Sequence, residues 1–267
     1  MMTTDSPVIS ADSHIQEPPE LYEQWLSKKY RHRTPHTTTD SEGAVYRVVD
    51  GKRPRRIDIS ESRITEDDQN REFRNDPSGG RDIGKRLLDQ ERDNICAEVI
   101  YPNQSLFLYN SPDAGYQLAL AKAYNTWLWE LVASNKDRFA PVAIVPVADL
   151  DGAVAEAHRV AKLGYKALKI PITMTDRPYN DPAYTPFWAT CEDAGLVVSF
   201  HAFTNSDDRY PEDWGEENGT GGALNLMAMS MIDGMNPVSL LISSGTLMRH
   251  PDLKFVVVEC GAGWLAW

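Results

Sequence analysis

The chain has 267 residues, of which 42% are hydrophobic and 25% charged, and its net charge is −12. This composition is typical of a globular protein with a substantial core and excludes a disordered chain. The negative charge argues against nucleic acid or an anionic membrane as the main partner, but a local cationic pocket for an acidic small molecule remains compatible with it. We therefore expect a small-molecule ligand, with no nucleic acid and no membrane as partner.

Cysteine usage and the N-terminal residues bear on the compartment. The three cysteines, Cys96, Cys191 and Cys260, are too few and too scattered for a disulfide framework or a Cys-x-x-Cys metal site. No apolar run approaches the ~18 residues of a membrane span, and residues 1–6 lack the basic and apolar regions of a secretory signal. The sequence thus predicts a cytoplasmic protein with reduced, buried thiols.

The first part of the chain combines one strand with a long polar segment. Residues 7–11 predict a strand, and residues 18–26 predict a short helix with proline in its first turn. Residues 29–80 are basic, polar and rich in threonine, with a predicted hairpin around 48–52 and a flexible stretch at 77–80. We interpret residues 29–80 as an insertion after the first strand.

From residue 82 onward, helical periodicity alternates with short apolar runs. Helices are predicted at 82–94, 112–134, 151–163, 181–194 and 224–248, the last interrupted at Asn236–Pro237. Strands are predicted at 97–102, 139–147, 165–171, 196–201 and 253–259. Apolar strands separated by amphipathic helices indicate a parallel sheet covered by helices. The length suits a single α/β domain over residues 1–267, because barrels of this type reach about 250 residues.

Asp12 and His14 form the most informative motif, two metal-binding residue types near the end of the first strand. Residues two apart on a strand face the same side, so both side chains could bind one ion. A carboxylate oxygen beside an imidazole nitrogen suits Zn²⁺, Mn²⁺ or Fe²⁺ better than Ca²⁺ or Cu⁺. The alternative is a turn with a solvated histidine.

Three further polar residues end predicted strands, where the active site of a parallel α/β barrel lies. His201 is a candidate metal ligand, or a core histidine hydrogen-bonded to the backbone. Lys169 could be carbamylated between two metals, could bind a substrate carboxylate, or could be structural. Glu259 could bind metal, act as general acid or base, or be an outer-shell partner of His201.

Several segments, in order along the chain, carry a resemblance to a known family. They are residues 9–18, 138–141, 164–169, 186–188 leading to 200–201, and 250–255. The chain resembles the amidohydrolase-related group of the metal-dependent hydrolase superfamily, which includes aminocarboxymuconate semialdehyde decarboxylase and the resorcylate and carboxyvanillate decarboxylases. The resemblance implies a metal-dependent hydrolase-type TIM barrel that acts in decarboxylation or hydrolysis.

The resemblance also implies roles for individual residues. Asp12 and His14 match the first-strand metal pair, and His201 matches the fifth-strand ligand, with a part in catalysis. Glu259 departs from the family pattern, because many members have at this place a histidine used in acid/base work, and we keep Glu259 as the expected catalytic residue. Lys169 is the expected substrate-binding residue. One divalent metal is implied as cofactor, zinc before manganese or iron.

One departure from the family concerns the C-terminus. Members carry a further metal-binding aspartate at the end of the eighth strand, whereas this chain ends at Trp267, just after the sixth predicted strand. We therefore expect an incomplete barrel with about six of the eight strand–helix units and a missing C-terminal part. We expect this truncated chain to be inactive and the full-length parent to be a homo-oligomer.

Three functions remain open at this point. The first is a decarboxylase acting on a small, aromatic or unsaturated carboxylic acid, favoured because an acid at the first metal position resembles the aromatic decarboxylases. The second is a hydrolase of an amide, ester or lactone, in which metal activates water. The third is an inactive fragment or binding protein. The expected partner is a small-molecule carboxylic acid substrate.

Overall fold

A computed structural model describes residues 7–18, 20–49, 54–56, 77–103, 105, 108–109, 111–174, 176–204 and 219–266. The chain divides into two compact units, one of residues 1–104 with 126–141 and the other of residues 105–125 with 142–267. Each unit contains its own group of parallel strands. The organisation as a single domain with an insertion at 29–80 stays a prediction.

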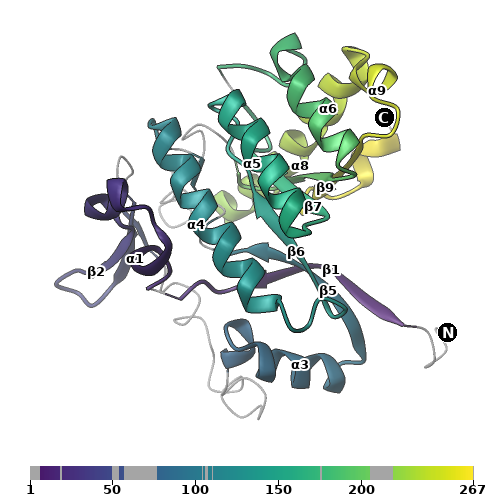
Figure 1. Ribbon diagram of the computed structural model, residues 1–267. Coiled ribbons are helices and arrows are strands. Elements are labelled where there is room, and N and C mark those ends of the chain that lie inside the picture. The colour runs from purple at the N-terminus through teal and green to yellow at the C-terminus, as the bar shows by residue number, and fades with distance from the viewer. Residues whose placement is uncertain are drawn as a thin grey trace. The chain divides into compact units, whose positions relative to one another are not determined.

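The first unit is built on β1 (Val8–Ile15), which pairs in parallel with β5 (Ile95–Pro102). Figure 1 shows β1 in purple running beside β5, and β5 also pairs with the first half of β6 (Phe139–Ile144). Its helical elements are α1 (Leu21–Trp25), η1 (Lys28–Arg33), η3 (Pro77–Gly80) and α3 (Ile83–Arg92). A separate antiparallel sheet consists of β2 (His36–Thr39), β3 (Val45–Val48) and β4 (Arg55–Arg56).

The second unit continues from the second half of β6. Its further parallel strands are β7 (Ala167–Ile170), β8 (Val197–His201) and β9 (Lys254–Val258). Its helical elements are α5 (Leu150–Leu163), η5 (Pro182–Tyr184), α6 (Thr185–Asp193), α8 (Gly219–Ser243), α9 (Thr246–Arg249) and η6 (Gly263–Ala266), with α4 (Ala114–Val132) contributing its first half. Figure 1 shows α5 and α6 side by side.

The parallel strands follow the order β1-β5-β6-β7-β8-β9, so each strand pairs with the next parallel strand along the chain. This order confirms the predicted parallel sheet with helical crossovers.

Local signals explain several helix ends. Asp82 and Asp149 each accept a hydrogen bond from a first-turn amide, at the starts of α3 and α5. Gly164, with φ of 113°, ends α5 in the left-handed conformation that favours glycine.

A buried hydrogen-bond network around Asn125 joins α4 to the strand β6 in the second unit. The Asn125 Nδ2 donates to the Ile144 carbonyl at 2.8 Å, and its Oδ1 accepts from the Ile144 amide at 2.7 Å. The same Nδ2 donates to Glu156 Oε1 at 2.8 Å, and Glu156 is bound by two nitrogens of Arg159. Asn125 and Glu156 are both fully buried, so this network satisfies polar groups that water does not reach.

The structure corrects three local predictions. The first strand continues to Ile15, so Asp12 and His14 lie within β1 and do not follow it. Residues 77–80 form the helix η3 rather than a flexible stretch, and the Gly80 carbonyl accepts the Gln16 amide at 2.8 Å. The helix α8 passes through Pro237, although this proline removes one helical hydrogen bond, since the helix beyond it packs through the fully buried Leu241. The helical run instead breaks before α9 at Gly245, where φ is 68°. Residues 50–52 of the predicted hairpin lie outside the described residues, but β3 and β4 pair antiparallel around them.

The cysteines are mostly buried, as predicted. Cys191 and Cys260 lie in the interior, whereas Cys96 is half-buried. Burial raises the pKa of the Cys260 thiol to about 12. Gly234 of α8 packs directly on this thiol, since a Cβ at position 234 would overlap the Cys260 side chain.

Among the described helices, none is both long and apolar enough to cross a lipid bilayer.

We expect Asn125→Ala to lower the free energy of unfolding by about 2–4 kcal/mol, because it leaves the buried amide and carbonyl of Ile144 without their side-chain partner. Denaturant unfolding followed by circular dichroism measures this change. The matched control is Asn236→Ala, at an exposed position of α8, which we expect to change stability by less than about 0.5 kcal/mol. Equal stability of the two variants would contradict the proposed importance of the network.

Candidate functional site

The segment of β1 that carries Asp12 contains a β-bulge. Ser10 pairs with Glu98 and Ser13 pairs with Ile100, so three residue steps on β1 oppose two on β5. The hydroxyls of Ser10 and Ser13 are 2.7 Å apart and hydrogen-bond across the bulge. Bulges of this kind redirect one side chain, and they occur often beside functional sites. Here the bulge includes Asp12.

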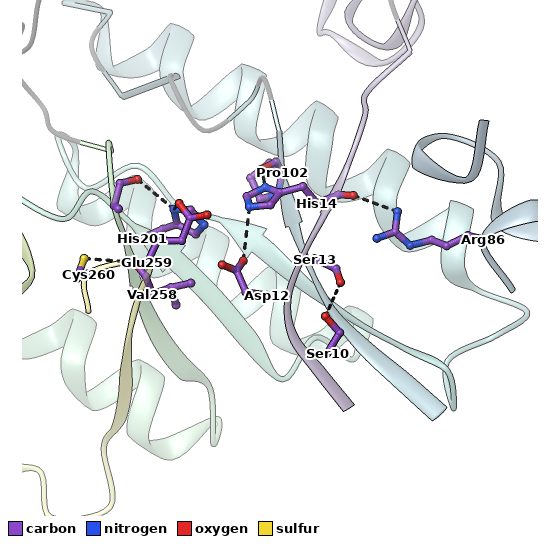
Figure 2. A network of polar contacts seen from close by, with 11 residues as sticks. Ser10, Asp12, Ser13, His14, Arg86, Pro102, His201, Val258, Glu259 and Cys260 are labelled. Atoms are coloured by element: carbon purple, nitrogen blue, oxygen red, sulfur yellow. Dashed lines mark hydrogen bonds and ion pairs between the residues drawn. The ribbon is translucent and has the colours of Figure 1, made fainter. Parts of the chain in front are cut away.

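Asp12 and His14 come together as the sequence predicted. The His14 Nε2 lies 3.5 Å from Asp12 Oδ1, and about a quarter of each side chain is exposed. Figure 2 shows the two side chains facing each other, with the His14 ring against Pro102. The His14 Nδ1 is 2.7 Å from the Pro102 carbonyl. A carbonyl only accepts hydrogen bonds, so Nδ1 carries the proton. In the neutral ring, the lone pair is therefore on Nε2, on the side of Asp12.

This arrangement fits a bound cation. A neutral His14 presents an acceptor nitrogen, and an ionised Asp12 presents an acceptor oxygen, so the two atoms repel unless a proton or a cation lies with them. Histidines that bind a metal usually donate their other ring N–H to a carboxylate, a backbone carbonyl or water, as the His14 Nδ1 does to Pro102. The Asp12–His14 pair therefore has the donor atoms and the fixed tautomer that a divalent metal requires.

His201 ends β8 and is completely buried. Its Nδ1 is 3.0 Å from the Ala202 carbonyl, so this nitrogen again donates and Nε2 carries the lone pair. The hydroxyl of Thr204 donates to the His201 carbonyl at 2.6 Å and fixes the turn after the strand. His201 therefore has the same tautomer as His14, held in each case by a backbone carbonyl.

Glu259 follows β9 directly and lies beside His201. Its Oε2 is 3.9 Å from the His201 Nδ1, and 42% of its side chain is exposed. The carboxylate therefore lies near the protonated nitrogen of the ring, and Figure 2 shows Glu259 beside His201. The backbone of Glu259 has φ of 60°, a left-handed conformation that is uncommon for residues other than glycine. Such strain is found where a structure holds a residue for function.

Lys169, near the end of β7, is also completely buried. It pairs in register with Ser199, and Ser199 is two residues before His201, so the three side chains share one face of the sheet. The Lys169 Nζ lies 4.6 Å from the centre of the Tyr109 ring. The Tyr109 hydroxyl donates to the Lys169 carbonyl at 3.0 Å, and burial raises the pKa of Tyr109, which keeps this donor protonated.

The structure thus brings the predicted residues together within each unit. Asp12 and His14 form one pair in the first unit, while His201 and Glu259 form another in the second, on the same sheet face as Lys169. Sequence reasoning missed Tyr109, because the short segment between β5 and α4 has no periodic signal. It also missed Arg86, because the burial that requires a charged or polar partner for this arginine is known only from the structure.

The strained backbone of Glu259 predicts a gain in stability when it is replaced by glycine. Glu259→Gly should raise the free energy of unfolding by about 1 kcal/mol, because glycine adopts positive φ at no steric cost. Glu259→Gln, which keeps a Cβ and removes the charge, should leave stability nearly unchanged. Thermal and denaturant unfolding of both variants measures the difference. If the glycine variant is no more stable than the glutamine variant, the backbone at this position stores no strain.

Comparisons with known proteins place this site in a family. The sequence profile of the family described as Amidohydrolase matches residues 88–267. Gamma-resorcylate decarboxylase from Rhodococcus jostii (strain RHA1) is 26% identical over 194 residues, which cover 68% of this chain and 56% of that protein. The chain thus spans little more than half the length of this curated relative.

Solved structures show the same fold. A crystal structure of an amidohydrolase from Mycobacterium avium subsp. paratuberculosis K-10 superposes with a TM-score of 0.74 at 21% identity, covering 98% of this chain and 74% of that one. Dihydroxybenzoic acid decarboxylase from Polaromonas sp. JS666, solved with bound manganese and the inhibitor 2-nitroresorcinol, gives a TM-score of 0.56 at 17% identity, with 94% and 64% covered. These likenesses confirm the predicted barrel-type α/β fold, of which the described residues form six parallel strands. Because the family profile matches more than half of the chain, this protein belongs to the amidohydrolase family.

Proposed function

We propose that this protein is a metal-dependent decarboxylase that acts on a small, aromatic or unsaturated carboxylic acid. The observation that carries the proposal is the Asp12–His14 pair, in which a fixed tautomer turns an imidazole lone pair toward a carboxylate. The names of two relatives, a gamma-resorcylate decarboxylase and a dihydroxybenzoic acid decarboxylase with bound manganese, support the same chemistry.

In this proposal, Asp12, His14 and His201 bind one divalent metal. Their strands run parallel, and in a parallel α/β barrel the carboxyl ends of the strands surround a common active site. Each histidine has its Nδ1 hydrogen-bonded to a backbone carbonyl, which leaves Nε2 as the ligand atom. An Asp–His–His set suits zinc, our first expectation from the residue types, and equally manganese or iron.

Each residue of the proposed site has its own role in the decarboxylation. When bound, the metal would act as a Lewis acid on an oxygen of the substrate next to its carboxylate. Lys169 would hold the substrate carboxylate by charge, from a fully buried position on the face shared with His201. Glu259, carrying a proton taken from solvent, to which its side chain is exposed, would give that proton to the carbon that bears the carboxylate. The bond between this carbon and the carboxylate would then break, its electron pair would return to the ring or double bond of the substrate, and CO₂ would leave.

A hydrolase of an amide, ester or lactone is the second candidate, and the description of the matching family as Amidohydrolase favours it. In hydrolysis, Glu259 would act as a general base on the attacking water rather than as an acid toward carbon. Both reactions use the same metal ligands, so the ligand set alone does not separate them. A binding protein without activity is the outcome expected if no metal binds.

Replacing His201 with Ala should remove metal and activity together, whereas Glu259→Gln should keep the metal and slow turnover by about 10²- to 10⁴-fold. The reason is that the first change removes a proposed ligand and the second removes a proposed proton donor. Elemental analysis measures the bound metal, and steady-state rates measure the turnover. Loss of metal from the Glu259→Gln variant would reassign Glu259 as a ligand.

A substrate panel separates the two reaction classes. We expect CO₂ release from hydroxybenzoates and no hydrolysis of aryl esters or lactones of similar size, measured on the same preparation with manganese or zinc added. The chain spans 56% of the resorcylate decarboxylase, so the assays should include both this chain and any longer parent that contains it. Ester hydrolysis without CO₂ release would favour the hydrolase, and metal binding without either reaction would leave a binding protein.

A further inference from the structure

We propose that Arg86 is a positioning residue that holds His14 in the geometry required for metal binding. This inference rests on the proposed metal site and adds to it a residue that does not itself touch the metal. Arg86 lies on α3 and is buried, with only 8% of its surface exposed. Figure 2 shows its guanidinium reaching toward the backbone of His14.

The guanidinium of Arg86 makes three hydrogen bonds from its buried position. Its Nε donates to Glu98 Oε2 at 2.6 Å, so Arg86 and Glu98, a residue of β5, form a buried ion pair. Its Nη1 donates to the His14 carbonyl at 3.0 Å and to the Gly79 carbonyl at 3.3 Å. One side chain thus joins β5, the helix η3 and the backbone of His14.

The backbone of His14 needs such a partner. β1 stands at one end of the strand order and, among the described strands, pairs only with β5. Backbone groups of β1 that point away from β5 therefore have no strand to pair with, and buried carbonyls require a donor. Arg86 supplies that donor at His14 itself, and the Gln16 amide bonded to Gly80 fastens the chain two residues later.

His14 is held in place both at its ring and at its main chain. Its ring is fixed by the Pro102 carbonyl, and its main chain is fixed by Arg86. The bulge between Ser10 and Ser13 leaves β1 locally out of register, so the ladder alone specifies this part of the strand less strongly. Without the Arg86 bond, the main chain of His14 gains freedom, and the Nε2 lone pair is less well aligned with Asp12.

Arg86→Lys is the most informative substitution. A lysine keeps the charge for the ion pair with Glu98, but its single ammonium cannot reproduce the fork that reaches Glu98 and the His14 carbonyl together. Arg86→Gln combined with Glu98→Gln removes both charges and leaves no buried charge unpaired. The matched control is Arg159→Lys, because Arg159 also makes two hydrogen bonds to a buried carboxylate, and both of them go to Glu156, which is not a proposed ligand.

The test measures the dissociation constant for Mn²⁺ in the whole chain and the absorption spectrum of bound Co²⁺, beside the melting temperature without metal. We expect Mn²⁺ binding to weaken about 10- to 100-fold in Arg86→Lys and in the double variant, with a changed Co²⁺ spectrum, and to stay unchanged in Arg159→Lys. A purely structural role would lower the melting temperature and leave both metal readouts as in the wild type.

The outcomes separate this inference from the proposed function. If the wild type binds Mn²⁺ and the Arg86 variants bind it equally well, Arg86 is not a positioning residue, although the metal site stands. If the wild type binds neither Mn²⁺ nor Co²⁺, the proposed metal function fails, and the inference fails with it. Weaker Mn²⁺ binding in the Arg159→Lys control to the same degree would also overturn the assignment, because the effect would then be general.

Discussion

The hydrogen bond from His14 Nδ1 to the Pro102 carbonyl is the interaction on which the candidate site depends most. It joins His14, one residue before the end of β1, to Pro102, the last residue of the parallel strand β5, and it decides which ring nitrogen keeps its lone pair. The same device recurs at His201, where the Ala202 carbonyl takes the Nδ1 proton. In both places, main-chain atoms set the chemistry of a side chain, so the fold itself determines the protonation pattern of the site.

The residue types of the site could be read from the sequence, but their detailed roles could not. Asp12 and His14 lie two residues apart on β1, so alternation along a strand singled out this pair. His201 and Glu259 lie at the ends of later strands, and that position singled them out. The bulge that contains Asp12 has no sequence signal, because it depends on the partner strand. The side of the His201 ring that Glu259 approaches, and the contact of Lys169 with Tyr109, join residues far apart in the chain and required the structure.

The parallel strand order was predictable because each apolar run is followed by a helix with clear end signals, such as Asp149 and Gly164 around α5. The errors came where a local rule competed with packing. Pro237 predicts a helix break, yet α8 continues, and Leu241 beyond it is completely buried. The polar and glycine-rich residues 77–80 predict a flexible stretch, yet two backbone carbonyls there accept hydrogen bonds from Gln16 and Arg86. Tertiary contacts outweighed local propensity in both cases.

The close packing of Gly234 on Cys260 has a practical consequence for chemical labelling. A thiol reacts as the thiolate, and a pKa of about 12 leaves Cys260 almost wholly protonated at neutral pH, behind a helix that has no room for an added group. Cys191 is equally enclosed. Cys96 on β5 is the more accessible thiol, so a maleimide dye or spin label should attach there first. The strand beside β1 thereby becomes open to fluorescence or distance spectroscopy without the removal of any native cysteine.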